Sequence, residues 1–196
     1  MKKIILSVVL FLFISTSFCQ SFMHGAGITI LGGYTKGGDF TFAEGFTYSP
    51  RFNFVETEKL SVSVGIPLSI GISASTTGSY DYYTDTYNES IGFVFNAPVV
   101  ISLNMGRGST NENRDKFGYF VGAGYGYHHG SFISTDDYDQ SGLTSSNENN
   151  FGPTANAGLR FGVGRKHKNI ELRFSYFKGL NDKKPNIFGI AGLFNF

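Results

Sequence analysis

The clearest pattern in the chain is a strict alternation of residue types over residues 60–73, LSVSVGIPLSIGIS. Every even-numbered residue in this segment is large and apolar, and the residues between them are Ser, Gly or Pro. A period of two places all the apolar side chains on one face of a β-strand. At about 14 residues, the strand is longer than the roughly five or six residues that are usual. Such a strand is typical of a transmembrane β-barrel, with lipid outside and a lumen inside.

The same alternation recurs along the chain and predicts eight strands in all. They cover approximately residues 25–34, 40–54, 60–73, 90–105, 117–129, 154–164, 169–178 and 187–196. An even number is what a closed bacterial barrel with both chain ends on one side requires. Closure also leaves no unpaired strand edge in lipid. We therefore predict an all-β fold, a closed antiparallel eight-stranded transmembrane up-and-down β-barrel, formed by residues 20–196.

The connections between these strands fall into two sets. Residues 35–39, 74–89, 130–153 and 179–186 form one set, and residues 55–59, 106–116 and 165–168 form the other. Outer-membrane barrels have short periplasmic turns and longer outer loops. The first set contains the two longest connections, so we predict that it faces outward. The 106–116 connection, GRGSTNENRDK, is long for a periplasmic turn.

The N-terminal residues predict export. Lys2 and Lys3 precede an apolar run over 4–18, and the small-ended tripeptide Ser17-Phe18-Cys19 follows. This is the pattern of a secretory signal peptide, so we expect residues 1–19 to be removed. The apolar run is short for a membrane helix. Lipid attachment at Cys19 is the alternative, although bulky Phe18 fits such a site poorly.

Composition agrees with an exported barrel and argues against nucleic acid. Charged residues make up only 16% of the chain, against about 25% in an average soluble domain. Aromatic residues also reach 16%, and Gly accounts for 26 residues, as suits β-strands joined by tight turns. Without Lys2 and Lys3, the 16 basic residues become 14, against 15 acidic ones. Such a balance gives no basic surface for a nucleic-acid partner.

The last ten residues, IFGIAGLFNF, carry a second pattern. Apolar side chains recur at alternate positions back from the C-terminus, at Phe188, Ile190, Phe194 and Phe196. This resembles the C-terminal strand signal that the barrel-assembly machinery reads. With its signal peptide and strand number, the chain resembles small outer-membrane barrels of the OmpA/OmpX type. The resemblance implies an integral outer-membrane location, with outer-membrane lipid and the assembly machinery as partners, and it says little about function.

Inward positions of the predicted strands carry a set of polar residues. They are Arg51, Asn53, Asn96, Asn104, Asn156, Arg160, Glu171 and Arg173. The lumen of an eight-stranded barrel is just wide enough to be filled by side chains, and buried charges must pair. We therefore expect a polar plug in which Glu171 pairs with arginine. The alternative is a narrow anion-favouring channel, because inward Arg outnumbers inward Glu and many inward positions are glycine.

Two prolines fall inside strands that are predicted to be central. Pro67 and Pro98 lie on neighbouring strands, where each proline removes a hydrogen bond of the sheet. One explanation is a pair of β-bulges, which are common in barrels. The alternative is a lateral opening, since lipid A palmitoyltransferases and OmpW-like proteins have prolines at lateral gaps. An unbroken strand ladder through both prolines would exclude the opening.

The outer loops are acidic and rich in Tyr. Residues 74–89 and 130–153 contain no Lys or Arg. Their candidate binding residues are Asp81, Asp85, Glu89, Asp136, Asp137 and Asp139. Tyr is favoured at recognition surfaces, so these loops could bind an extracellular or envelope protein, a glycan or calcium. The acidic run 136–139 lacks the spaced ligands of a calcium loop, and a solvated loop is the simpler alternative.

These observations favour a structural or recognition role without enzyme activity or cofactor, in which the barrel displays its loops or serves as a subunit of a larger outer-membrane assembly. A narrow pore or a laterally open conduit for small hydrophobic molecules is the alternative.

His129 and Ser131 have the His-x-Ser spacing of outer-membrane lipid A deacylases, but that family carries its pair just before the last strand. His128 and His129 point to opposite faces of a strand and cannot grip one metal together. We expect both at the membrane interface.

Overall fold

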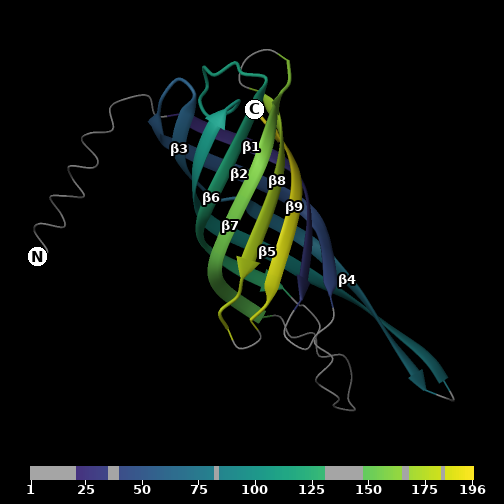
Figure 1. The fold of residues 1–196 in the computed structure, drawn as a ribbon. Coiled ribbons are helices and arrows are strands. Elements are labelled where there is room, and N and C mark those ends of the chain that lie inside the picture. Colours follow the sequence, from purple (N-terminus) through teal and green to yellow (C-terminus); the bar gives the residue numbers. More distant parts are fainter. Residues whose placement is uncertain (1–20, 35–39, 82–83, 131–147, 165–167, 182–183) are drawn as a thin grey trace, which may run out of the picture.

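The computed structural model describes residues 21–34, 40–81, 84–130, 148–164, 168–181 and 184–196, with the backbone alone for 74–91 and 148. The predicted signal peptide lies outside this range. The described residues form nine strands (Figure 1). They are β1 (Ser21–Tyr34), β2 (Thr41–Glu56), β3 (Leu60–Gly65), β4 (Leu68–Asp81), β5 (Thr84–Gly106), β6 (Phe117–Gly130), β7 (Glu148–Gly162), β8 (Asn169–Lys178) and β9 (Asn186–Asn195). No helix long and apolar enough to cross a membrane occurs in them.

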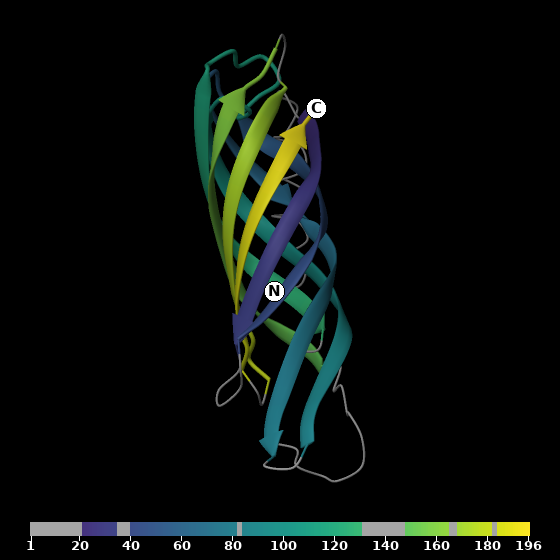
Figure 2. The same ribbon diagram turned by 90° about the vertical axis from the view of Figure 1, so that its right-hand side faces the viewer.

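The strands close into a barrel of eight antiparallel positions, which confirms the predicted fold class. β3 and β4 are collinear and together form one strand of the barrel, since both pair with β2 on one side and with β5 on the other. The first and last strands then close the ring, as β1 pairs with β2 on one side and with β9 on the other. Figure 2 shows β1 lying beside β9 along the length of the barrel. Every strand is therefore paired on both sides within the barrel wall.

The apolar face of each strand points out of the barrel, where lipid would lie. The exposed fraction is 70% for Phe46 and 65% for Ile28, values that a soluble protein of this size would not repeat over its whole circumference. Glu44 interrupts this face on β2, between Ile30 of β1 and Ile72 of β4. The outward surface otherwise has the chemistry of a transmembrane barrel.

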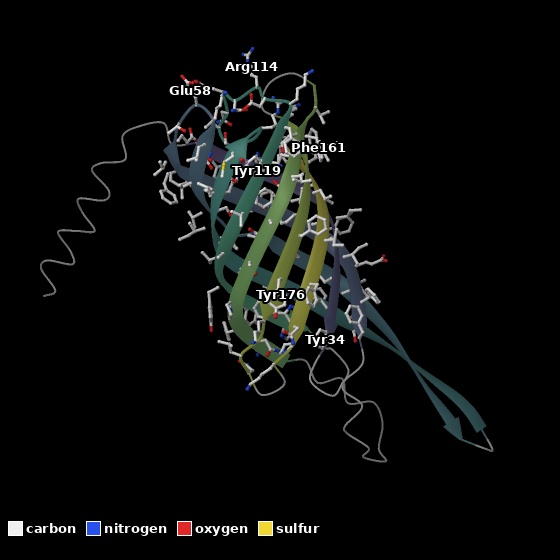
Figure 3. The ribbon with its side chains drawn as sticks, viewed as in Figure 1. Tyr34, Glu58, Arg114, Tyr119, Phe161 and Tyr176 are labelled. Atoms are coloured by element: carbon white, nitrogen blue, oxygen red, sulfur yellow. The ribbon has the colours of Figure 1, made fainter. Side chains whose placement is uncertain are left out.

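Aromatic side chains gather near both ends of this surface. At one end, Phe117 packs on Phe161 at 5.4 Å between ring centres. At the other end, Phe188 lies between Tyr34 and Tyr176, at 6.4 and 5.1 Å. Figure 3 shows Tyr119 and Phe161 towards one end of the barrel and Tyr34 and Tyr176 towards the other. Two such belts mark the two membrane–water interfaces of an outer-membrane barrel.

The chain ends and the turns define the direction of the barrel. The C-terminus and the segments around Glu58 and Arg114 lie at one end (Figures 1 and 3). We call this the periplasmic end, following the predicted orientation, and the opposite end the outer end. The connections from β2 to β3, from β5 to β6 and from β7 to β8 all lie at the periplasmic end.

Two segments that were predicted as outer loop are strand instead. The predicted 74–89 loop is a two-stranded ribbon in which β4 and β5 pair from Ala74 with Ile91 to Asp81 with Thr84. The ribbon extends beyond the outer end of the barrel (Figures 1 and 2). β7 also begins earlier than predicted, at Glu148, and pairs there with Gly130 of β6. Residues 74–89 are rich in Thr and Tyr, which favour strands without showing a period of two.

The predicted third strand, residues 60–73, is interrupted at Ile66 and Pro67. The bulge explanation is wrong here, because the register is the same before and after the break. Gly65 pairs with Val100 and Ser69 with Asn96, so Pro67 stands opposite Pro98 with no residue inserted. The register shift that the barrel does contain lies elsewhere, between Asn53 and Val55 of β2.

Candidate functional site

The polar lumen is centred on Glu171 of β8, whose carboxylate is completely buried. Arg160 of β7 donates from Nε to Oε2 at 2.7 Å, and Arg173 donates from Nε to Oε1 at 2.9 Å. Asn195 of β9 donates to Oε2 at 3.1 Å. Arg51 of β2 reaches only to 4.0 Å from the same oxygen. A single carboxylate thus holds guanidinium groups from three strands in the middle of the barrel.

The other predicted lumen residues extend this network. Asn104 accepts a hydrogen bond from Arg160 at 2.9 Å and donates to Ser63 at the same distance. Asn156 is buried as well, and Asn96 lines a cavity with it further along the barrel. The ring of Phe120 lies beneath Arg160, 4.3 Å from its guanidinium carbon. All eight polar residues therefore face the lumen, although Asn96 and Asn156 stand apart from Glu171.

The long turn after β5 folds into the periplasmic mouth of the barrel. Arg107, Gly108, Ser109 and Thr110 are all buried. The carbonyl oxygen of Gly108 accepts from Arg51 at 2.6 Å and from Arg160 at 3.3 Å. Sequence analysis left the length of this connection unexplained, because acceptors on a backbone leave no mark in the sequence. The turn covers the arginine cluster on its periplasmic side.

Further contacts bind the inserted turn to the barrel wall and to its neighbours. The Ser109 carbonyl accepts from Asn53 at 2.8 Å and from Ser61 at 2.6 Å. Asn113 donates to the Glu58 carbonyl at 3.0 Å, and Arg107 donates to the Lys168 carbonyl at 2.8 Å. The three periplasmic connections are thereby joined to one another, and the mouth is closed.

The outer half of the lumen combines apolar side chains with small polar ones such as Thr41, Ser73 and Asn150, which are also buried. Buried side chains from five strands meet there, namely Leu31, Ala43, Val94, Phe177 and Ile187. His128 belongs to this region, with an exposed fraction of 0% and its ring 5.9 Å from that of Phe177. The expectation that His128 lies at the membrane interface is therefore wrong. His129 faces outward and bonds to Asn149 at 2.7 Å, so the two histidines do point to opposite faces.

Two small cavities lie among these lumen residues. One, of about 30 Å³, is lined by Pro67, Pro98, Asn96 and Asn156 among others. The second, of about 20 Å³, lies among the three arginines around Glu171. Each has room for about one or two water-sized molecules.

The wall beside these cavities contains a proline that sequence analysis did not single out. Ile66 donates to the carbonyl of Pro50 on β2 at 3.1 Å. Because successive residues of a strand bond to opposite neighbours, Pro67 directs its backbone towards Pro98 of β5. The two facing pairs are Ile66 with Pro50 and Pro67 with Pro98. Three of their four backbone nitrogens belong to proline and carry no hydrogen. This proline cluster (Pro50, Pro67 and Pro98) explains why the ladder breaks here while the register continues.

The remaining predicted residues fall in the projecting ribbon, along the C-terminal segment and outside the described range. Asp81 ends β4, and Asp85 and Glu89 lie in β5, so all three belong to the projecting ribbon. Asp136, Asp137, Asp139 and Ser131 lie outside the described residues. Phe188, Ile190 and Phe194 of β9 and Phe196 directly after it point outward, and the Phe196 nitrogen donates to the His24 carbonyl at 3.1 Å. In the part of the chain that the structure describes, no group of three His, Cys, Asp or Glu could hold a metal ion.

Comparisons with known proteins agree with this architecture. No protein family model matches the chain, and no curated protein matches its sequence. Solved structures of outer-membrane barrels share its fold. Ail, the attachment invasion locus protein of Yersinia pestis, is 13% identical, covers 91% of this chain and 99% of its own, and has a TM-score of 0.53. Neisserial surface protein A (NspA) is 12% identical, covers 90% and 97%, and has the same TM-score.

A second structure of Ail, in complex with the heparin analogue sucrose octasulfate, is similar too. It is 14% identical, covers 91% of this chain and 100% of its own, and has a TM-score of 0.50. At this level of identity the likeness concerns the fold. The chain therefore has the fold of small eight-stranded outer-membrane β-barrels, as the resemblance to the OmpA/OmpX type predicted. By that fold it is an integral outer-membrane protein.

Proposed function

We propose that this protein is a non-enzymatic outer-membrane barrel that displays acidic, Tyr-rich segments to a basic partner outside the membrane. The observation that carries the proposal is the ribbon formed by β4 and β5 beyond the outer end of the barrel (Figures 1 and 2). Residues 74–89 contain three acidic residues and four tyrosines, and neither Lys nor Arg. A rigid barrel holding such a segment away from the membrane suits recognition.

The chemistry of the partner follows from the charge of the displayed segment. Ail binds the heparin analogue sucrose octasulfate, which is a polyanion. The acidic ribbon of this chain would repel a polyanion and attract a basic surface. We therefore propose a basic extracellular or envelope protein as the partner, which also accommodates a role as a subunit of a larger assembly.

The filled lumen supports this function over transport. Its periplasmic mouth is occupied by Arg107–Thr110, and its outer half by buried apolar and small polar side chains. A pore needs a continuous water-filled path, whereas the cavities of the described barrel measure only about 20 and 30 Å³.

The test compares proteins that copurify from mild-detergent extracts of the envelope. The ribbon variant carries Asp81→Asn, Asp85→Asn and Glu89→Gln, and the control carries Glu58→Gln, Glu112→Gln and Asp115→Asn at the periplasmic end. A basic protein recovered in equal amounts with the wild type and the control, but lost with the ribbon variant, is the expected result. The proposal fails if no protein copurifies, or if recovery is the same for all three.

The proline cluster supports a second candidate function, as a lateral conduit for small hydrophobic molecules. The broken ladder at Pro67 borders the cavity of about 30 Å³, whose lining also includes Leu31 and Phe177. A conduit would need β4 and β5 to separate at this point. Uptake of a hydrophobic fluorescent probe into liposomes that contain the barrel, abolished in a Pro67→Val/Pro98→Val variant, is the expected result. Equal uptake with and without the protein would exclude it.

A further inference from the structure

The lumen contains more buried positive charge than its carboxylates neutralise. Arg51, Arg160 and Arg173 have exposed fractions of 8%, 1% and 8%, and they surround the single buried carboxylate of Glu171. Three positive charges against one leave an excess of two. Burying an unpaired charge in a low-dielectric interior costs several kcal/mol. The cluster therefore lacks negative charge.

The surrounding described residues supply only part of that charge. Glu56, at the periplasmic mouth, acts on Arg51 through space, but Asn53 donates to its carboxylate at 2.6 Å and Ser21 also bonds to it. The next buried charge is Arg107, which is again positive. The carbonyl of Gly108 accepts from Arg51 and Arg160, but a carbonyl offers only a partial charge.

One of the small cavities lies within this cluster. The cavity of about 20 Å³ is lined by all three arginines, by Ser49, Ser102, Asn104 and Asn156, and by Phe120. Arg51 Nε is buried and has no hydrogen-bond acceptor among the described residues. A buried cation with a free N–H therefore lines a space of molecular size.

We propose that this cavity binds a small monovalent inorganic anion of the size of chloride. The anion would accept from Arg51 Nε and lie within the field of Arg160 and Arg173, with the Ser102 hydroxyl as a further donor. Charge-assisted hydrogen bonds of this kind are the strong ones. A volume of about 20 Å³ fits one particle of about the size of water, which excludes larger oxyanions such as sulfate.

Diffraction provides the most direct test of the site. Crystals of the barrel grown in sodium bromide should show an anomalous peak in the cavity, at hydrogen-bond distance from Arg51 Nε. Bromide is the probe because it substitutes for chloride and scatters anomalously. Density without an anomalous signal would show that water fills the cavity, and would overturn the proposal. This measurement needs no variant, so it does not depend on the folding of one.

Unfolding in solution tests the same site by linkage. Sodium gluconate is replaced by sodium chloride at constant ionic strength, and the urea midpoint of the refolded barrel is measured. An anion that binds only the folded state raises the midpoint as its concentration rises. In Arg51→Gln, the loss of one charged donor should weaken chloride binding by about 10- to 100-fold. Arg114→Gln, in the exposed part of the turn, should keep the wild-type response.

A midpoint in the wild type that is equal in gluconate and chloride would contradict the proposal. So would a chloride response that is unchanged in Arg51→Gln, because the stabilisation would then arise elsewhere on the barrel. The readout is the response to chloride rather than stability itself, and a structural effect of the substitution alone would leave that response intact.

Discussion

Glu171 is the residue on which the interior of the barrel depends. It is completely buried, and it takes hydrogen bonds from Arg160, Arg173 and Asn195, which lie on three different strands. A buried ion pair adds little stability over an apolar pair, but removing one partner leaves the other charge unpaired. The single carboxylate therefore controls whether three arginines can be tolerated inside the barrel.

We predict that Glu171→Gln lowers the free energy of unfolding by about 3–5 kcal/mol, because it leaves the surrounding guanidinium groups without their carboxylate. Urea unfolding of the barrel refolded into lipid vesicles measures the change. Glu44→Gln serves as the control, since Glu44 is exposed on the outward face. It should cost nothing and could stabilise, because charge on a lipid-facing surface is unfavourable. Equal effects of the two substitutions would contradict the assignment.

His128 shows how far residue-level inference reaches. Alternation predicts that it faces opposite to His129, and the structure agrees. Its place inside the lumen beside Phe177 was not predicted. The neighbouring tyrosines at positions 125 and 127 favoured the membrane interface, but they point outward while His128 points inward.

At the scale of elements, the turn after β5 is the least ordinary part of the barrel. Gly108 holds a positive φ of 71° at the point where the turn enters the lumen. A Cβ at this position would lie 2.9 Å from Asn169 Nδ2 and 3.0 Å from Arg160 Cδ. The turn thus needs glycine for two separate reasons, its backbone conformation and its close packing.

A matched pair of substitutions separates these two reasons. Gly164 has a φ of 67° in another periplasmic turn, but a Cβ there would meet nothing within 4 Å. Gly164→Ala should therefore cost only the backbone strain, about 1–2 kcal/mol. Gly108→Ala should cost measurably more in the same urea assay, because it also disturbs the packing of the inserted turn. Equal losses would mean that the turn does not pack inside the barrel.

The break between β3 and β4 yields a second prediction at this scale. Pro67 and Pro98 face one another as a pair that lacks both N–H donors. Pro67→Val with Pro98→Val restores both donors, and two hydrogen bonds should add about 1–3 kcal/mol to the stability. Each single substitution restores one donor and should give about half the gain. Hydrogen exchange of the new amides checks the result, and rapid exchange in the double variant would contradict it.

The elements also show what a sequence reveals and what it hides. Alternation located every strand of the barrel wall and its outward face, because that face meets lipid along its whole length. It missed the strand character of 74–81 and 84–90, because the sequence there shows no period of two. It also missed the inserted turn at 107–110 and the role of Pro50, since both depend on contacts across strands rather than on local sequence.

At the scale of the whole molecule, the described lumen is packed with side chains. The inserted turn fills the periplasmic mouth, the arginine cluster lies next to it, and apolar and small polar side chains fill the outer half. We therefore predict no steady conductance in planar lipid bilayers at neutral pH. Insertion is checked in the same sample by the heat-dependent mobility of the barrel on gels. Regular channels of constant conductance would contradict a packed lumen and support the narrow pore instead.

The account as a whole requires lipid hydrocarbon around the barrel and an interior packed with side chains. Spin labels at single introduced cysteines test this most directly, in barrels reconstituted into lipid vesicles. Labels at Ile101 and Ile170, which face outward, should be accessible to lipid-soluble oxygen and shielded from a water-soluble nickel complex. Labels at Ser63 and Ser102, on the inward face, should be shielded from both reagents. The account is contradicted if the outward labels meet the nickel complex as readily as oxygen.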